Sequence, residues 1–150
     1  MKVCTFFGHR DSYGVDIDQL KALIRTAICD YGCTQFWCGG YGAFDSIAAQ
    51  TVRSMKEEYP HIRLVRIYAY LPSGVDGLAA YYDETILPEG QELAPKRYAI
   101  SRRNEWIAEH CDAAIACISL PSGGAFRAVK RIMRQKKPVW NLGSLPLEGK

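Results

Sequence analysis

The chain has 150 residues, of which 48% are hydrophobic, 11% aromatic and 23% charged. This length and composition are typical of one globular domain and exclude a disordered, collagen-like or low-complexity chain. The 19 basic and 16 acidic residues leave a net charge of +3, which is too small to indicate a nucleic-acid partner by itself. The sequence contains neither an apolar run of membrane-spanning length nor a secretory signal at its start, so we expect a cytoplasmic protein with no membrane partner.

Short apolar runs alternate with stretches of helical periodicity along most of the chain. We expect strands at residues 3–7, 35–38, 63–71, 113–118 and 139–142. We expect helices from an Asp16-x-x-Gln19 cap to about residue 32, from the turn at 39–42 to a stop before Pro60, from 96 to 110, and from 124 to about 136. Continuous apolar strands separated by helices predict an α/β fold: a single doubly wound, Rossmann-like domain over residues 1–150 with a mainly parallel sheet.

Residues 72–96 interrupt this alternation. The stretch from 71 to 95 holds three prolines, three glycines and five acids but no basic residue. We expect a short helix near residues 78–82 and a brief strand near 85–87, within a long excursion that we interpret as a lid or binding loop.

The six cysteines include no Cys-x-x-Cys pair, and the three histidines lie far apart in the sequence. Cys4, Cys38 and Cys117 fall inside apolar runs, where free cysteine behaves as a small buried hydrophobe. We therefore expect reduced thiols, no disulfide framework and no metal site.

Glycine-rich or polar turns follow three of the expected strands: Gly8-His9-Arg10, Gly39-Gly40-Tyr41-Gly42 and Ser122-Gly123-Gly124. In a doubly wound sheet these turns share the carboxyl edge, where helix N-termini present unpaired backbone N–H groups to anions. They are either simple tight turns or, as we expect from their number, an anion or nucleotide site. The sequence has neither G-x-G-x-x-G nor a Walker A motif. The candidate ligand-binding residues are Gly8, His9, Arg10, Gly39, Gly40, Gly42, Asp45, Arg103, Asn104, Ser122, Gly123 and Gly124.

A helical wheel places Arg103 on the inward side of its helix, on the face shared by Ala99, Trp106, Ile107 and His110. A guanidinium there needs an anionic partner, which is either a ligand phosphate or, as a structural ion pair, Asp45 or Asp112.

His9, Asp45 and Asp83 are the candidate acid–base residues, should the site be catalytic. His9 is equally explained as a hydrogen-bonded turn residue and Asp45 as a helix cap.

Four segments in this order resemble the SLOG superfamily, the group that also holds the Smf/DprA and LOG proteins, and within it the YpsA-like branch. They are residues 4–10, residues 39–45, residues 103–107 with 112–116, and residues 122–124. The resemblance implies a Rossmann-like SLOG fold that binds a nucleotide or nucleotide-derived ligand, such as an ADP-ribose- or NAD-like molecule, at the glycine-rich edge. It also implies a homo-oligomer, because related domains commonly form dimers.

Our first hypothesis is therefore a binding domain with a sensing or regulatory role. A LOG-like nucleotide N-glycosidase is the second. LOG proteins resemble P-G-G-x-G-T-x-x-E, and here Lys130 stands where that glutamate would be, which weakens the hydrolase hypothesis because lysine cannot stabilise an oxocarbenium-like centre. DprA-like binding of single-stranded DNA by the basic helix at residues 127–137 is the third; the solvated face of an amphipathic helix explains that charge, so nucleic acid is not the expected partner.

Overall fold

The computed structural model describes residues 1–12, 14–40, 42–71 and 79–147. Within them the strands are β1 (Lys2–Gly8), β2 (Cys33–Cys38), β3 (Arg63–Ile67), β4 (Glu84–Ile86), β5 (Ala113–Cys117) and β6 (Val139–Asn141). The α-helices are α1 (Ile17–Cys29), α2 (Gly42–Met55), α3 (Lys96–His110) and α4 (Gly124–Arg134), and two short 3₁₀ helices are η1 (Ala79–Tyr81) and η2 (Gln91–Leu93). The expected alternation of strands and helices is confirmed.

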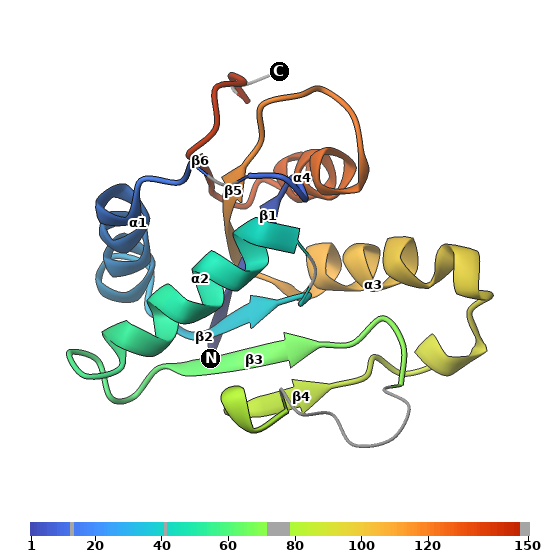
Figure 1. Cartoon of the computed structure of the whole chain (residues 1–150), viewed down its shortest axis with the longest axis horizontal. Coiled ribbons are helices and arrows are strands. Elements are labelled where there is room, and N and C mark those ends of the chain that lie inside the picture. The colour runs from blue at the N-terminus through green and yellow to red at the C-terminus, as the bar shows by residue number, and fades with distance from the viewer. Residues whose placement is uncertain (13, 41, 72–78, 148–150) are drawn as a thin grey trace.

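The strands form one sheet in the order β4-β3-β2-β1-β5-β6, in which every pairing is parallel. The arrowheads of β2, β3 and β4 accordingly point the same way in Figure 1. β1 lies beside β5, although the chain forms β2, β3 and β4 between them. The sheet therefore has a topological switch point between β1 and β5, as in Rossmann-like domains, and the predicted fold class is confirmed.

Each face of the sheet is covered by two helices. Successive side chains of a strand point to opposite faces, so Phe6 packs with α1 and α2 whereas Phe7 packs with α3 and α4. The first core contains Leu20, Ile24, Phe36, Phe44, Val52, Leu64 and Ile115; the second contains Trp37, Val65, Ile107, Ala116, Val129 and Ile132. Fully burying a side chain of this size contributes roughly 1.5–3 kcal/mol, so these two cores carry most of the folding free energy.

A stack of three aromatic rings packs α3 against the sheet. Trp37 of β2 stacks on Trp106 of α3 with ring centroids 5.1 Å apart, and Trp106 stacks on His110 at 4.3 Å. The inward face of α3 consists of Ala99, Arg103, Ile107 and Ala108. His110 is exposed, so its expected place on that face is wrong: the ring lies over Trp106 at the margin of the core.

Two elements end earlier than the sequence predicts. β3 stops at Ile67 rather than at residue 71, because side chains rather than a neighbouring strand donate to the carbonyl groups there. Arg103 donates to Ile67 O, and Gln91 donates to Ala69 O. α4 stops at Arg134 because Lys136 adopts a left-handed conformation, with φ 65°. The predicted cap of α1 is confirmed, since Gln19 N donates to Asp16 Oδ1 at 3.2 Å.

The segment interpreted as a lid is anchored where the structure describes it. β4 pairs with β3, and the buried side chain of Gln91 donates to Ala69 O and to Ala99 O. Residues 72–78, the other part of that interpretation, lie outside the described residues. A lid over a ligand therefore stays a prediction.

All six cysteines are free, and four of them are buried: Cys4, Cys33, Cys38 and Cys111. Burial raises the pKa of Cys33 and of Cys111 to about 11, and it also raises the pKa of Cys4 and Cys38. Thiolates are the reactive form of cysteine, so in the native protein we expect Ellman's reagent to modify the exposed Cys29 first, the half-buried Cys117 more slowly, and the buried four only after unfolding in guanidinium. Cys29→Ser should remove the fast phase; fast modification of more than two thiols would contradict the buried assignments.

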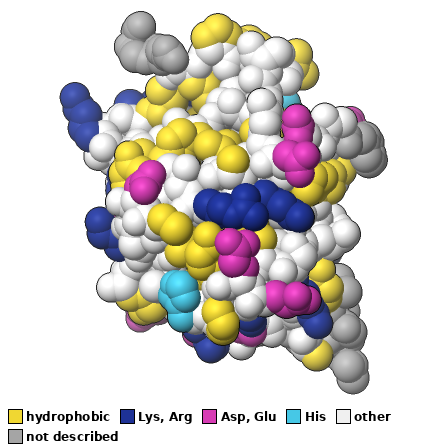
Figure 2. Space-filling view, turned by 90° about the vertical axis from the view of Figure 1, so that its left-hand side faces the viewer, with side chains coloured by type: hydrophobic (Ala, Val, Ile, Leu, Met, Phe, Trp, Pro, Cys, Tyr) yellow, Lys and Arg dark blue, Asp and Glu magenta, His cyan; other side chains and the backbone are white. Residues whose placement is uncertain are grey.

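Charges of both signs are interspersed on the face shown in Figure 2, where basic side chains lie next to acidic ones. In the part of the chain that the structure describes, no helix has the length and apolar character needed to span a bilayer.

Candidate functional site

A cavity of about 290 Å³ lies at the switch point, at the carboxyl edge of β1 and β5. We call it the glycine cavity. Its lining is Phe6, Phe7, Gly8, His9, Arg10, Gly39, Asp45, Ile100, Arg103, Asn104, Gly123, Gly124 and Ala125. Nine of the twelve residues proposed from the sequence are among them, brought together from the ends of β1 and β2 and from α2, α3 and the start of α4.

The start of α4 presents backbone N–H groups to this cavity. The helix cap is Gly123, and the first backbone bond of the helix runs from Arg127 N to Gly123 O at 3.1 Å. The amides of Gly124, Ala125 and Phe126 therefore have no acceptor within the helix. Gly123 has no side chain that could accept from them. Such an end, at the positive pole of the helix dipole, favours an anion.

Gly123 is glycine for a conformational reason. Its φ of 97° and ψ of 173° lie in a backbone region that is essentially restricted to glycine. A Cβ built there meets no atom within 4 Å, so the constraint is torsional rather than steric.

Arg103 is 3% exposed, and its guanidinium donates hydrogen bonds to backbone carbonyls at the carboxyl ends of two strands, β2 and β3. Nη1 donates to Gly39 O at 2.8 Å and to Ile67 O at 3.0 Å. A Cβ on Gly39 would lie 2.9 Å from Arg103 Cζ, so only glycine leaves room for this contact. The alternative of an ion pair with Asp112 is wrong, because Asp112 is on the other edge of the sheet and accepts from Val3 N at 2.8 Å.

Arg103 also orients its neighbour. Its Nε donates to Asn104 Oδ1 at 3.0 Å, which fixes the amide of Asn104 with Nδ2 toward the start of α4, 3.6 Å from where a Gly124 Cβ would lie. Arg103 is therefore a positioning residue, and Asn104 is the side chain that offers a free amide donor at the cavity wall.

His9 joins two loops of the edge. Its Nε2 accepts from Leu120 N at 3.1 Å, and its backbone N donates to Cys117 O at 3.3 Å. An accepting Nε2 places the ring proton on Nδ1. This arrangement favours the hydrogen-bonded turn residue over the acid–base role.

Asp45 and Arg10 supply the charge next to the amides. Asp45 lies in the first turn of α2, is half-buried, and is the one acid among the described lining residues. Arg10 is exposed at the mouth, where its carbonyl accepts from Ala43 N at 2.9 Å. A carboxylate accepts from hydroxyl groups, whereas a guanidinium binds phosphate, so the two suit different parts of one ligand.

Gly40, Gly42 and Ser122 are not among the described residues that line the cavity, so their contact with a ligand stays a prediction. Gly40 makes room for the side chain of Arg66, and Gly42 lets the backbone of Arg10 approach α2: a Cβ would lie 2.7 Å from Arg66 Nε or 3.0 Å from Arg10 Cα. Ser122 is exposed. Gly40 and Gly42 therefore determine how closely neighbouring groups pack at this edge of the sheet.

Asp83 is remote from the cavity, so it cannot act there as acid or base. It accepts from Leu64 N at 2.7 Å and pairs with Lys56, at the amino end of β3. Partial burial raises its pKa, but the hydrogen bonds from Lys56 and Leu64 and the charges of Lys56 and Arg63 outweigh this and hold the pKa below its ordinary value of 3.8.

This lowered pKa predicts a pH dependence of stability. The folded state favours the carboxylate, so the contribution of Asp83 is complete at neutral pH and is lost as the pH falls below about 4. We expect Asp83→Asn to lower the free energy of unfolding at pH 7, with a difference from wild type that shrinks at pH 3 in urea titrations. A difference that grows on acidification would contradict the ion pair.

Sequence reasoning missed the apolar wall of the cavity. Ile100 and Ala125 lie there beside Asn104 and Gly124. The signal for Ile100 was its position one turn before Asn104 on the same helix, which puts the two side chains on one face. The described ranges contain no group of three His, Cys, Asp or Glu side chains placed to hold a metal ion.

Solved structures with this fold match the chain along nearly its full length. DNA processing protein A (DprA) from Streptococcus pneumoniae matches with a TM-score of 0.68 at 15% identity, over 99% of this chain and 52% of that one, so the chain spans about half of that protein. The Moco carrier protein from Chlamydomonas reinhardtii matches with a TM-score of 0.59 at 18% identity, over 97% of this chain and 78% of that one. DprA from Helicobacter pylori matches with a TM-score of 0.63 at 14% identity, over 99% of this chain and 68% of that one. No protein-family model and no curated protein matches the sequence.

These likenesses confirm the Rossmann-like α/β fold. The Helicobacter pylori protein binds single-stranded DNA and the Chlamydomonas protein carries Moco, so neighbours in this fold bind ligands of different kinds.

Proposed function

We propose that the chain binds a nucleotide or nucleotide-derived ligand, such as an ADP-ribose- or NAD-like molecule, in the glycine cavity. One observation carries this proposal: Gly124 and Ala125 at the start of α4, together with Arg10, Asp45 and Asn104, all line one cavity at the switch point of a doubly wound sheet. Ligands of such sheets bind at this point.

The lining suits the parts of a nucleoside phosphate. The amides at the start of α4 and Arg10 would hold the phosphate. Asp45 would accept from the ribose hydroxyls, and Asn104 would donate to an acceptor of the sugar or base. Ile100 offers an apolar surface to the base. In this arrangement Arg103 acts on the ligand through Asn104, because its Nε donates to Asn104 Oδ1 while its Nη1 donates to Gly39 O and Ile67 O.

A thermal-shift screen with AMP, ADP-ribose and NAD, followed by chromatography of each mixture, tests the proposal. We expect a rise in Tm that grows with ligand concentration, without released base or ribose phosphate. Asn104→Ala should weaken AMP binding on the order of five- to tenfold, the effect of one hydrogen bond to a charged or polar ligand group. Arg102→Ala, an exposed neighbour on α3, is the matched control and should bind as wild type.

No rise in Tm with any of these compounds would overturn the proposal. Release of base at a rate that Asp45→Asn abolishes would replace it with the hydrolase hypothesis, in which Asp45 is the remaining acid–base candidate at the cavity.

A further inference from the structure

A larger depression continues from the glycine cavity. A groove of about 690 Å³ lies between α3 and α4, and Ile100, Asn104 and Gly124 line both the groove and the cavity. We call it the α3–α4 groove. The cavity alone is at the lower end of the roughly 300–1,000 Å³ found for small-molecule sites, so a ligand larger than a mononucleotide would extend into the groove.

The α3–α4 groove is strongly basic. Its lining includes five basic residues, Arg97, Arg127, Lys130, Arg131 and Arg134, and one acid, Glu105. Arg131 is paired with Glu109 at 2.8 Å. No carboxylate within the described residues forms an ion pair with the other four. This concentration of one sign differs from the mixed face in Figure 2.

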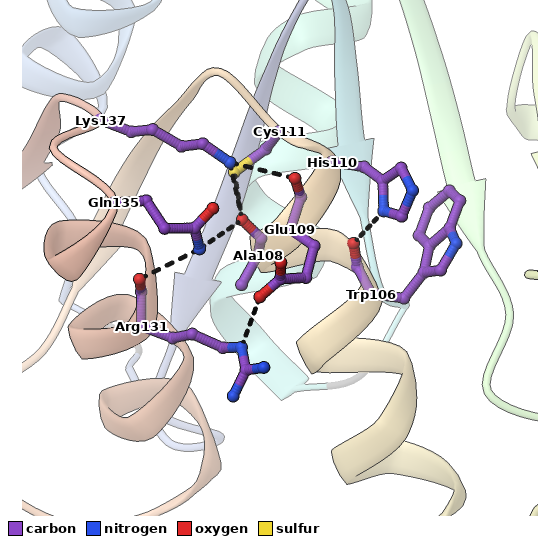
Figure 3. Close-up of polar contacts among 8 residues, drawn as sticks. All are labelled: Trp106, Ala108, Glu109, His110, Cys111, Arg131, Gln135 and Lys137. Carbon is purple, nitrogen blue, oxygen red and sulfur yellow. Dashed lines mark hydrogen bonds and ion pairs between the residues drawn. The ribbon is translucent and has the colours of Figure 1, made fainter.

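Figure 3 shows how the basic segment at residues 127–137 contacts the end of α3. At its C-terminal end, Lys137 donates to Ala108 O at 3.0 Å and Glu109 O at 3.1 Å, and Gln135 donates to Ala108 O at 3.2 Å. These contacts cap the end of α3, where the helix dipole favours cations. The predicted amphipathic helix is present, with Val129 and Ile132 buried and Arg127 and Arg134 exposed. Lys137, which lies beyond the end of α4, has a structural role instead.

The N-terminal parts of α3 and α4 carry cations, where the helix dipole favours anions. α3 begins with Lys96 and Arg97, α4 carries Arg127 just after its first turn, and neither first turn contains an acid. Each such placement is unfavourable by a few tenths of a kcal/mol to about 1 kcal/mol. A bound polyanion would turn this unfavourable arrangement into a favourable one, because both the helix dipoles and the basic side chains would attract it.

One aromatic side chain stands among these cations. Phe126 is half-buried on the wall of the groove, with Lys130 Nζ 6.0 Å from its ring centroid. A ring exposed on one side beside basic groups is suited to stacking a base.

We infer that the site binds a dinucleoside polyphosphate, with one nucleoside phosphate in the glycine cavity, the phosphate chain along Arg127 and Lys130 of the α3–α4 groove, and the second base against Phe126. This inference rests on the proposed function, because the first nucleotide occupies the same cavity. It adds the class of ligand: a polyphosphate chain with a nucleoside at each end.

Calorimetric titration of the full chain with AMP and with diadenosine tetraphosphate tests the inference. Wild type should bind diadenosine tetraphosphate at least tenfold more tightly than AMP. The double variant R127Q/K130Q should lose on the order of tenfold or more for diadenosine tetraphosphate and less than twofold for AMP, since charge-assisted contacts are removed only from the groove. The control K21Q/R25Q removes two charges from α1, on the opposite face of the sheet, and should change neither affinity.

The outcomes separate the two proposals. If AMP binds but diadenosine tetraphosphate binds no more tightly, or if R127Q/K130Q weakens both ligands equally, the groove inference is overturned and nucleotide binding stands. If neither compound binds, both proposals fail. Tighter binding of an oligothymidylate than of diadenosine tetraphosphate, abolished by R127Q/K130Q, would overturn the dinucleotide in favour of nucleic acid.

Discussion

Replacing Arg103 by alanine should lower the free energy of unfolding by roughly 2–5 kcal/mol, because two buried carbonyl groups, Gly39 O and Ile67 O, lose their donor. That is a large fraction of the 5–15 kcal/mol typical of a domain. Chemical denaturation monitored by circular dichroism measures it. Arg103→Lys should recover only part of the loss, since one ammonium group cannot reproduce the planar set of donors that reaches both strands and Asn104.

Arg102→Ala is the internal control for this experiment. Arg102 is exposed on the same helix, so its removal should change stability by no more than about 0.5 kcal/mol. Equal effects of the two substitutions would contradict the buried role of Arg103. Wild-type stability of Arg103→Ala together with lost nucleotide binding would assign the guanidinium to the ligand instead.

Gly123→Ala should cost roughly 1–3 kcal/mol of stability, because alanine is strained at φ 97° and ψ 173°. The space around Gly123 is open, so the loop can relax, and relaxation would turn the amides of Gly124 and Ala125 away from the glycine cavity. We therefore expect the affinity for AMP to fall on the order of tenfold or more. Denaturation and calorimetry on the same preparation measure the two effects.

Gly14→Ala provides the matched comparison. A Cβ at Gly14 also meets no atom within 4 Å, but its φ is not in the left-handed region. Stability should be unchanged or rise by up to about 1 kcal/mol through the lower entropy of the unfolded chain, with AMP binding intact. Loss of stability of the same size in both variants would show that the conformation of Gly123 is not what matters.

The predicted elements succeed where the signal is local. The Asp16 cap, the start of α3 after Pro95 and the apolar runs of β1 and β5 are all readable within a few residues of sequence. The end of β3 is different, because it depends on Gln91 and Arg103, 22 and 36 residues away from the carbonyls they bind. No pattern within one strand records such a partner.

The site follows the same rule. The convergence of Gly8, Gly39 and Gly123 on one cavity could be predicted, because parallel strands share a carboxyl edge. Which glycines line the cavity and which make room for a side chain could not be predicted. This depends on the side chain that packs over each turn, such as Arg66 over Gly40. The charge of residues 127–137 was visible in the sequence. Which of these residues cap α3 and which line the groove depends on the contact between the two helices.

The ring stack on α3 makes the protein its own optical reporter. Trp106 lies one turn beyond Arg103 on the helix that carries Asn104 to the glycine cavity, and it is in van der Waals stacking with Trp37 on the sheet. Any ligand that shifts α3 against β2 must change the overlap of these two indoles, and with it their emission intensity and exciton circular dichroism. Trp140, the third indole, pairs with Tyr31 at the other edge of the sheet and would keep a constant signal as an internal reference.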